Sequence, residues 1–480
     1  MERLSPLDAA FLEIEDEDPH ATLAIASLAI LAGPAPARDE FAAAIISRLP
    51  GVPRCHQKIR RVPFDLGPPV WVDDEAFRPE DHIGRLSVPA PHDEAALGEL
   101  VALLMDERFD RDGPLWRFWV IEGLTGGRWA VLSKVHHSLA DGVAAVGLQR
   151  VLFGSAPPSA EDAEPAPDPG SLRLLASALG DLVTSPFSGL GHLARSALHP
   201  RALARRATDV ARGFAALSTA LMPVAPTSLS GPLGRRRGYA FTRAALDDVV
   251  TTAKAFEVTV NDVLLAAVSG ALRELLVRSG EEPAADSVRS LVPVAVRAGH
   301  ESEVDNRVSL LLPLLPVDLP DPVQRLIRVH RRVAALKDSR EATAGEFVTT
   351  SAALGPFAAS AWAIRGAARL PQHNIVTVTT NVPAPPGELT VTSREVLELY
   401  PYVPIALRLR TGVAMLTYRG CVFFGVTVDR ATVPDPRFLA DAVVAELDAL
   451  KTAAVSAPRA ATRSRGSGST RRSMPKPKRT

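Results

Sequence analysis

The run His136-His137-Ser138-Leu139-Ala140-Asp141-Gly142 decides how this chain is interpreted. Before it, Trp129 to Val135 alternates in a way that predicts a β-strand ending at the two histidines. Successive side chains of a strand point to opposite faces, so one histidine can face a cleft while the other points away. After it, Val143 to Phe153 predicts a helix, with Asp141-Gly142 at the turn before it.

A histidine in such a turn suits general-base catalysis near neutral pH. Its ordinary pKa is about 6.5, so it can take the proton of an alcohol that attacks an acyl group. No Gly-x-Ser-x-Gly elbow occurs in the chain, so no motif supports a serine acyl-enzyme. We therefore predict that His137 acts directly on the hydroxyl of the acceptor.

Residues of these types also have structural and metal-binding roles in proteins. A lone histidine is usually structural, and an isolated Asp141 is most often a helix N-cap. Two adjacent histidines can belong to a metal site, but no His-Glu-x-x-His or Cys-x-x-Cys motif accompanies them. We predict no metal ion here.

The length of 480 residues exceeds one ordinary core, and 46% hydrophobic with 22% charged residues is typical of a globular protein. We predict an α/β protein with subdomains at residues 1–154 and 231–455, each mixing strands and helices. Residues 155–230 form a Pro-rich linker and a basic helical connection, and residues 456–480 a disordered basic tail. Elements expected from periodicity are helices at Glu94 to Phe109 and Asn261 to Arg278, and strands at Ser290 to Val296, Val308 to Pro316, Ile375 to Thr380, Val413 to Tyr418 and Cys421 to Val428.

Basic residues gather in two of these segments. Eight of the 54 Lys and Arg lie in residues 456–480, which hold no acid, and further arginines mark residues 195–212. Such segments are ordinarily solvated surface. The alternative is peripheral contact with a membrane or lipid droplet.

The sequence predicts a cytoplasmic protein. Acidic residues precede the first apolar run, unlike a secretory signal, and Cys55 and Cys421 suggest no disulfide framework. The uncharged stretches at residues 21–37 and 347–364 predict a core strand and a core helix. For the second stretch a lipid-facing helix is the alternative, because it contains Phe357 and Trp362 among small residues.

The heptad resembles the signature of the chloramphenicol acetyltransferase-like, CoA-dependent acyltransferase superfamily. Further short motifs, in this order and at these spacings, resemble those of the bacterial wax ester synthase/diacylglycerol acyltransferase family. These motifs are Leu4-Ser5-Pro6-Leu7-Asp8 with Phe11-Leu12, Pro114-Leu115-Trp116, Asn261-Asp262-Val263-Leu264, Val292-Pro293-Val294-Ala295-Val296-Arg297 and Asn381-Val382-Pro383-Ala384-Pro385.

The resemblance implies two chloramphenicol acetyltransferase-like subdomains with an active-site tunnel at their interface. It implies transfer of a long-chain acyl group from acyl-CoA, the co-substrate, to diacylglycerol, giving triacylglycerol, or to a fatty alcohol, giving wax ester. We expect no resident cofactor and no nucleic-acid partner. The protein would lie at the inner face of the plasma membrane or on lipid droplets.

The resemblance also assigns roles to residues. His137 is the general base and His136 supports it; Asp141 holds the site in shape by pairing with Arg297, and Gly142 forms the turn. Substrate-binding or supporting roles fall to Asn261, Asp262, Arg297 and Asn381, although Asn261 could simply cap its helix. Two alternatives remain: transfer to a polyketide or other secondary-metabolite hydroxyl, and a non-catalytic protein that binds lipid droplets.

Overall fold

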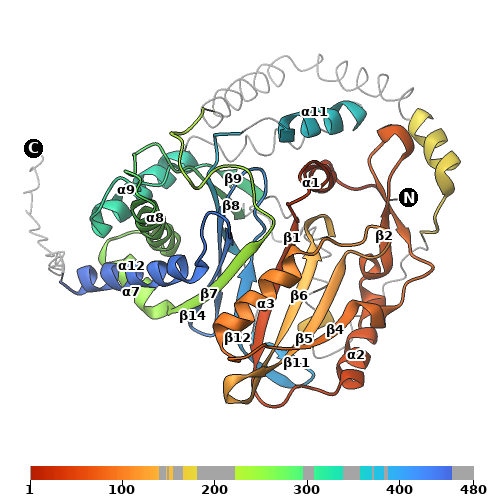
Figure 1. Ribbon diagram of the computed structural model, residues 1–480, viewed down its shortest axis with the longest axis horizontal. Helices are drawn as coiled ribbons and strands as arrows, with labels where there is room; N and C mark the ends of the chain where they lie inside the picture. Colours follow the sequence, from red (N-terminus) through yellow and green to blue (C-terminus); the bar gives the residue numbers. More distant parts are fainter. Residues whose placement is uncertain are drawn as a thin grey trace, which may run out of the picture.

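The computed structural model describes residues 2–139, 148, 151–154, 166–180, 222–295, 308–338, 357–369, 372–382 and 387–456. Helices and strands alternate in both halves of the chain, so the predicted α/β class is confirmed (Figure 1). Asp141, Gly142 and Arg297 lie outside the described residues. So do most of the predicted connection and residues 457–480 of the predicted tail.

Helices cover two mixed sheets. The described α-helices include α1 (Pro6–Glu17), α2 (Arg38–Ile46), α3 (Glu94–Asp106), α7 (Leu246–Ala255), α8 (Val260–Arg278), α9 (Pro322–Asp338), α11 (Phe357–Arg369) and α12 (Pro436–Ser456). The first sheet has the order β11 (Thr390–Val391), β12 (Arg394–Tyr402), β1 (Ala24–Leu31), β6 (Arg128–His136), β5 (Trp116–Leu124) and β4 (Ile83–Ser87). The second has the order β7 (Arg237–Ala245), β14 (Cys421–Asp429), β13 (Thr411–Tyr418), β10 (Thr377–Val382), β8 (Ser290–Ala295) and β9 (Val308–Leu311). A separate ribbon pairs β2 (Gln57–Arg60) with β3 (Val70–Asp73).

The strands expected from alternation are present to within two residues at each end, except for β9. β9 ends at Leu311, earlier than predicted, because Pro313 and Pro316 cannot donate to a sheet. Residues 347–356 of the predicted core helix lie outside the described residues. The remainder is helical in α11, but the Trp362 side chain is 70% exposed, so the predicted core position is wrong for this residue.

The second half of the chain contributes strands to the first sheet. β12 belongs to the second predicted subdomain, yet it pairs antiparallel with β1, with Ala26 opposite Tyr402 and Ala29 opposite Leu399. The other edge of β1 pairs with β6, with Ala24 opposite His136. The strand before the histidines therefore belongs to a sheet that both halves build (Figure 1).

The two sheets touch where β12 passes β14. A Cβ atom at Gly425 would lie 1.7 Å from the carbonyl oxygen of Pro401, so only glycine allows this approach. The hydroxyl of Tyr239 donates to the same carbonyl at 3.1 Å. The junction of the two sheets is fixed by backbone contact, not by side chains alone.

We expect Gly425→Ala to lower the free energy of unfolding by about 1–3 kcal/mol or more, because the backbone of β12 must move away. Urea denaturation measures this change. Gly366→Ala is the control, since a Cβ atom at that exposed position of α11 meets nothing within 4 Å. Equal stability of the two variants would contradict the assigned contact.

A second junction lies beside the connection from α1 to β1. The backbone N–H of Arg237 donates to the carboxylate of Asp106 at 3.2 Å, and its buried guanidinium donates to the carbonyl of His20. Asp429 lies 3.8 Å from the same guanidinium. β7 thus anchors the segment that leads from α1 into β1. β1 in turn pairs with β6, the strand that ends at the histidines.

Candidate active site

His137 lies at the first residue after β6. Its backbone N–H donates to the carbonyl of Leu23 at 2.9 Å, just outside the β1–β6 pairing, and residues His137–Leu139 then form a 3₁₀ turn, η6. The predicted strand followed by a turn is therefore present. This hydrogen bond fixes where the side chain of His137 leaves the sheet.

The ring of His137 packs against Phe11 of α1. The ring centroids are 4.0 Å apart and the planes are inclined by 33°. Burial lowers the pKa of His137 to about 4; a backbone hydrogen bond within the residue opposes this shift, and the neighbouring His136 adds to it. At neutral pH the imidazole is therefore uncharged, the form that accepts a proton.

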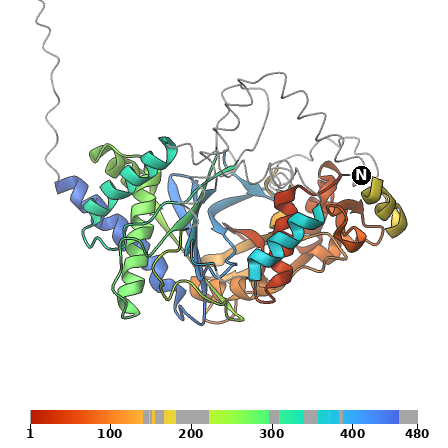
Figure 2. The ribbon, with the colours of Figure 1, turned by 90° about the horizontal axis from the view of Figure 1, so that it is seen from above.

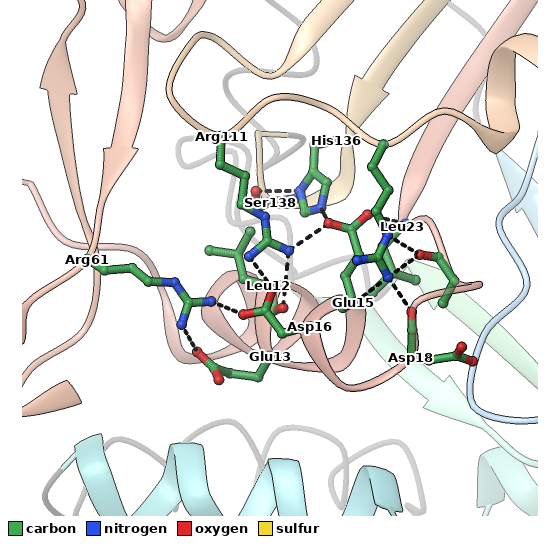
Figure 3. A network of polar contacts seen from close by, with 12 residues as sticks. Leu12, Glu13, Glu15, Asp16, Asp18, Leu23, Arg61, Arg111, His136 and Ser138 are labelled. Atoms are coloured by element: carbon green, nitrogen blue, oxygen red, sulfur yellow. Dashed lines mark hydrogen bonds and ion pairs between the residues drawn. The ribbon is translucent and has the colours of Figure 1, made fainter. Parts of the chain in front are cut away.

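His136 points to the opposite side and is buried. Its Nδ1 accepts the backbone N–H of Ser138 at 3.1 Å, and the Ser138 hydroxyl oxygen lies 2.7 Å from the same nitrogen. A neutral His136 therefore carries its proton on Nε2. That atom faces a carboxylate oxygen of Glu15 at 3.5 Å, an electrostatic contact longer than an ordinary hydrogen bond (Figure 3).

Glu15 is a buried, ionised carboxylate behind the two histidines. It accepts the backbone N–H of Leu23 at 3.1 Å and the guanidinium of Arg111 at 2.7 Å. Burial alone would raise its pKa, but His136, Arg111 and the Leu23 N–H together hold it at about 2. Glu15 thus connects α1 to two residues that contact His137. One is Leu23, whose carbonyl accepts the His137 N–H, and the other is His136, which precedes His137 in the chain.

Further ion pairs hold α1 in place below this carboxylate. Arg61 contacts Asp16 and lies 3.5 Å from Glu13, while Arg111 also pairs with Asp16 (Figure 3). Arg108 donates to backbone carbonyls of the last turn of the helix and of the segment after it, among them that of Ala21 at 2.9 Å. The position of Phe11 over His137 is consequently set by salt bridges along the rest of α1.

Asp262 has the contacts of a helix cap. Its carboxylate accepts the backbone N–H of Thr259 at 2.9 Å and lies 2.8 Å from Nδ1 of His330 on α9. The Thr259 side chain completes the capping box of α8, and Asn261 follows half-buried in the first turn. These contacts tie α8 to α9, which is a supporting role.

Asn381 lies near the end of β10, opposite Met415 of β13, and is exposed. Its predicted role in substrate binding stays a prediction, as do those of Asp141, Gly142 and Arg297. Among the described residues, no group of three or more His, Cys, Asp or Glu side chains is placed to hold a metal ion. Nor is any single helix of the described segments long and apolar enough to cross a membrane; α7 and α8 qualify only as a pair, bent by 101°.

Comparison with known proteins decides the family. The model of the wax ester synthase/diacylglycerol acyltransferase catalytic domain matches residues 4–264, and that of the C-terminal domain of the same family matches residues 304–451. The chain belongs to this family. The resemblance predicted from the heptad and the accompanying motifs is confirmed.

Two relatives align with nearly the whole length of this chain. A probable diacylglycerol O-acyltransferase of Mycobacterium tuberculosis is 40% identical over 469 residues, which cover 97% of this chain and 99% of the relative. A putative diacylglycerol O-acyltransferase of Mycobacterium bovis gives the same values. With the family match, these relatives identify the chain as an acyltransferase enzyme.

Solved structures share the fold of this acyltransferase. The wax ester synthase/diacylglycerol acyltransferase from Marinobacter aquaeolei has a TM-score of 0.64 at 23% identity, covering 94% of this chain and 100% of that one. The starter condensation domain of rhizomide synthetase, solved in complex with C8-CoA, has a TM-score of 0.56 at 15% identity and covers 95% of both chains. At such identities the likeness concerns the fold alone.

Sequence reasoning missed Glu15, Arg111 and the contact between Phe11 and His137. The available signal was weak: Phe11 and Glu15 are four residues apart, which places them on one face of a helix. Nothing in the sequence links that face to residues more than a hundred positions later. The contacts appear only when α1 is packed against the end of β6.

Proposed function

We propose that this acyltransferase transfers a long-chain acyl group from acyl-CoA to diacylglycerol, forming triacylglycerol, with His137 as general base. Fatty alcohols serve as alternative acceptors and give wax esters. The names of the 40% identical relatives support the acceptor. The observation that carries the mechanism is the position of the His137 imidazole at the end of β6, packed against Phe11, where burial lowers its pKa.

In the proposed reaction His137 handles a single proton. We assign this role to Nε2, the ring nitrogen farther from the backbone. Nε2 takes the hydroxyl proton as the acceptor oxygen attacks the thioester carbonyl carbon. The carbon–sulfur bond then breaks, the imidazolium returns the proton to the thiolate, and CoA leaves as the thiol.

A competing assignment is a serine nucleophile, because Ser138, His136 and Glu15 stand in the order of a catalytic triad. Two observations oppose it. Both Ser138 and His136 are buried, and Nδ1 of His136 already accepts the backbone N–H of Ser138. His136 is thus already occupied and the Ser138 hydroxyl is covered. We therefore assign both residues to structural support of the turn.

The assay for this function uses the purified full chain with radiolabelled palmitoyl-CoA and either dioleoylglycerol or hexadecanol. Labelled triacylglycerol or wax ester should appear in step with free CoA thiol. Release of CoA without ester would mean that the enzyme hydrolyses the thioester. Ester formed only with a polyketide-type hydroxyl would mean that the acceptor is a secondary metabolite and not a lipid. Lipid binding with no ester from any acceptor would leave a non-catalytic droplet protein.

The pH dependence of kcat/KM should show the lowered pKa of His137. Since the free enzyme keeps this imidazole neutral until about pH 4, the acid limb is expected near pH 4 and not near the ordinary value of about 6.5. Initial rates at low acyl-CoA between pH 3.5 and 8 measure it. A limb centred at 6.5 would show that the ring is solvated in the free enzyme.

A further inference from the structure

Two exposed aromatic side chains lie on neighbouring elements at one edge of the protein. Phe64, in the short turn η3 (Pro63–Asp65), is 82% exposed, and Trp362 on α11 is 70% exposed. The two elements are joined by an ion pair of 2.8 Å between Asp65 and Arg365. Trp362 lies one helical turn before Arg365, so both aromatic residues belong to this junction.

The backbone of η3 is strained where it presents Phe64. Both Phe64, at φ 59°, and Asp65, at φ 52°, adopt the left-handed conformation that residues other than glycine avoid. The Asp65 N–H donates to the carbonyl of Val62 at 3.1 Å, and its carboxylate holds Arg365. Strain that keeps an aromatic ring in solvent suggests that the ring has a partner there.

A third element extends the apolar surface. The helix over residues 170–180 packs on the segment after η3, with Ala178 near Gly67, and leaves Leu172 84% and Leu179 47% exposed. A cavity of about 270 Å³ beneath it is lined by Val62, Val70 and Leu174, among others. Figures 1 and 2 show α11 and this helix along the same edge of the molecule.

Several charged side chains around this surface are already paired with one another within the described residues. Arg365 contacts Glu13 as well as Asp65, Arg369 pairs with Glu17 at 2.6 Å, and Arg60 lies 3.5 Å from Asp168. An oppositely charged partner would gain little from such pairs. These pairs leave the exposed apolar side chains as the feature that a partner can bury.

We propose that Phe64, Trp362, Leu172 and Leu179 form a docking patch that inserts into a phospholipid bilayer. This inference rests on the proposed function, because diacylglycerol resides in the bilayer and must reach His137 from it. α1 supplies the connection: it packs on α11 through Glu13 and Glu17, while its Phe11 contacts His137. Aromatic rings are well suited to the boundary between headgroups and acyl chains.

Flotation with dioleoylphosphatidylcholine vesicles containing diacylglycerol tests the patch on the full chain. Phe64→Gly combined with Trp362→Ser should lower the bound fraction about tenfold or more, because two large apolar groups no longer leave water. Binding by the wild type should change little between about 0.05 and about 0.5 M salt, because salt screens charges and not apolar burial. The control is Val277→Ser with Val455→Ser, exposed valines at the ends of α8 and α12, which should float like wild type.

Folding and function are checked separately. The glycine at position 64 relieves strain, so the thermal midpoint of the patch variant should not fall. Transfer to hexanol without vesicles should be unchanged, while transfer to vesicle diacylglycerol should drop with binding. If the patch variant floats like the wild type, the docking patch is overturned. The same holds if light scattering shows that the patch joins two copies of the chain. If the wild type transferred the acyl group to none of the acceptors, the proposed function itself would instead be overturned.

Discussion

Replacing His137 with alanine should reduce the rate of acyl transfer by about a hundredfold or more, because no other group would take the hydroxyl proton. The loss should appear in kcat, since the missing interaction is made during proton transfer and not on binding. Circular dichroism and thermal unfolding should show an intact fold. The ring of His137 caps no helix and pairs no strand.

Ser138→Ala is the matched control for this variant. It removes the hydroxyl that faces His136 while the backbone N–H to Nδ1 remains, so we expect less than about a tenfold loss of rate. If Ser138→Ala were as damaging as His137→Ala, the triad of Ser138, His136 and Glu15 would be the better mechanism. Near-normal turnover by His137→Ala would remove the proposed base.

The second large effect concerns Glu15. Its folded pKa of about 2 lies below the ordinary 4.5, so the ionised form stabilises the folded protein. A shift of this size corresponds to roughly 3 kcal/mol. We therefore expect Glu15→Gln to lower the free energy of unfolding by about 3 kcal/mol at pH 7.

The pH dependence separates this charge from simple packing. Because the folded pKa is lowered, the contribution is complete above pH 4.5 and is lost as the pH falls toward 2. The difference between wild type and Glu15→Gln should shrink to less than about half by pH 3. Urea denaturation at several pH values measures it. A difference independent of pH would mean that the carboxylate acts by shape and not by charge.

Glu15 should also affect catalysis as a positioning residue, because it holds Leu23 and His136 on either side of the His137 turn. We expect the acid limb of kcat/KM to move in Glu15→Gln, since loosening of α1 exposes His137 and returns its pKa toward the ordinary value. A purely structural glutamate would lower stability and leave this limb in place.

Much of the fold could be predicted because its helices and strands follow from patterns within short stretches of sequence. The alternation before His136 and the helical spacing after Asn261 reproduce β6 and α8 to within a residue or two at each end. The heptad allowed His137 to be predicted as the base for the same reason, since the motif lies within seven consecutive residues.

The rest depends on contacts between distant segments. Periodicity shows which face of a strand is buried but not which strand lies beside it, so the insertion of β12 next to β1 could not be predicted. Glu15 counted only as an acidic residue before the first apolar run until α1 was packed against the histidines. Asp262 was assigned to the site by resemblance; its cap contact with Thr259 is local, but its contact with His330 depends on the packing of α9 against α8.

Intact-protein mass spectrometry tests the central claim, direct transfer to an acceptor activated by His137. The full chain is mixed with palmitoyl-CoA without acceptor, quenched in acid within milliseconds to minutes, and weighed; dioleoylglycerol is then added to a parallel sample. The mechanism predicts an unchanged protein mass at every time and triacylglycerol only after the acceptor is added. A protein heavier by one palmitoyl group, and lightened again by diacylglycerol, would contradict it.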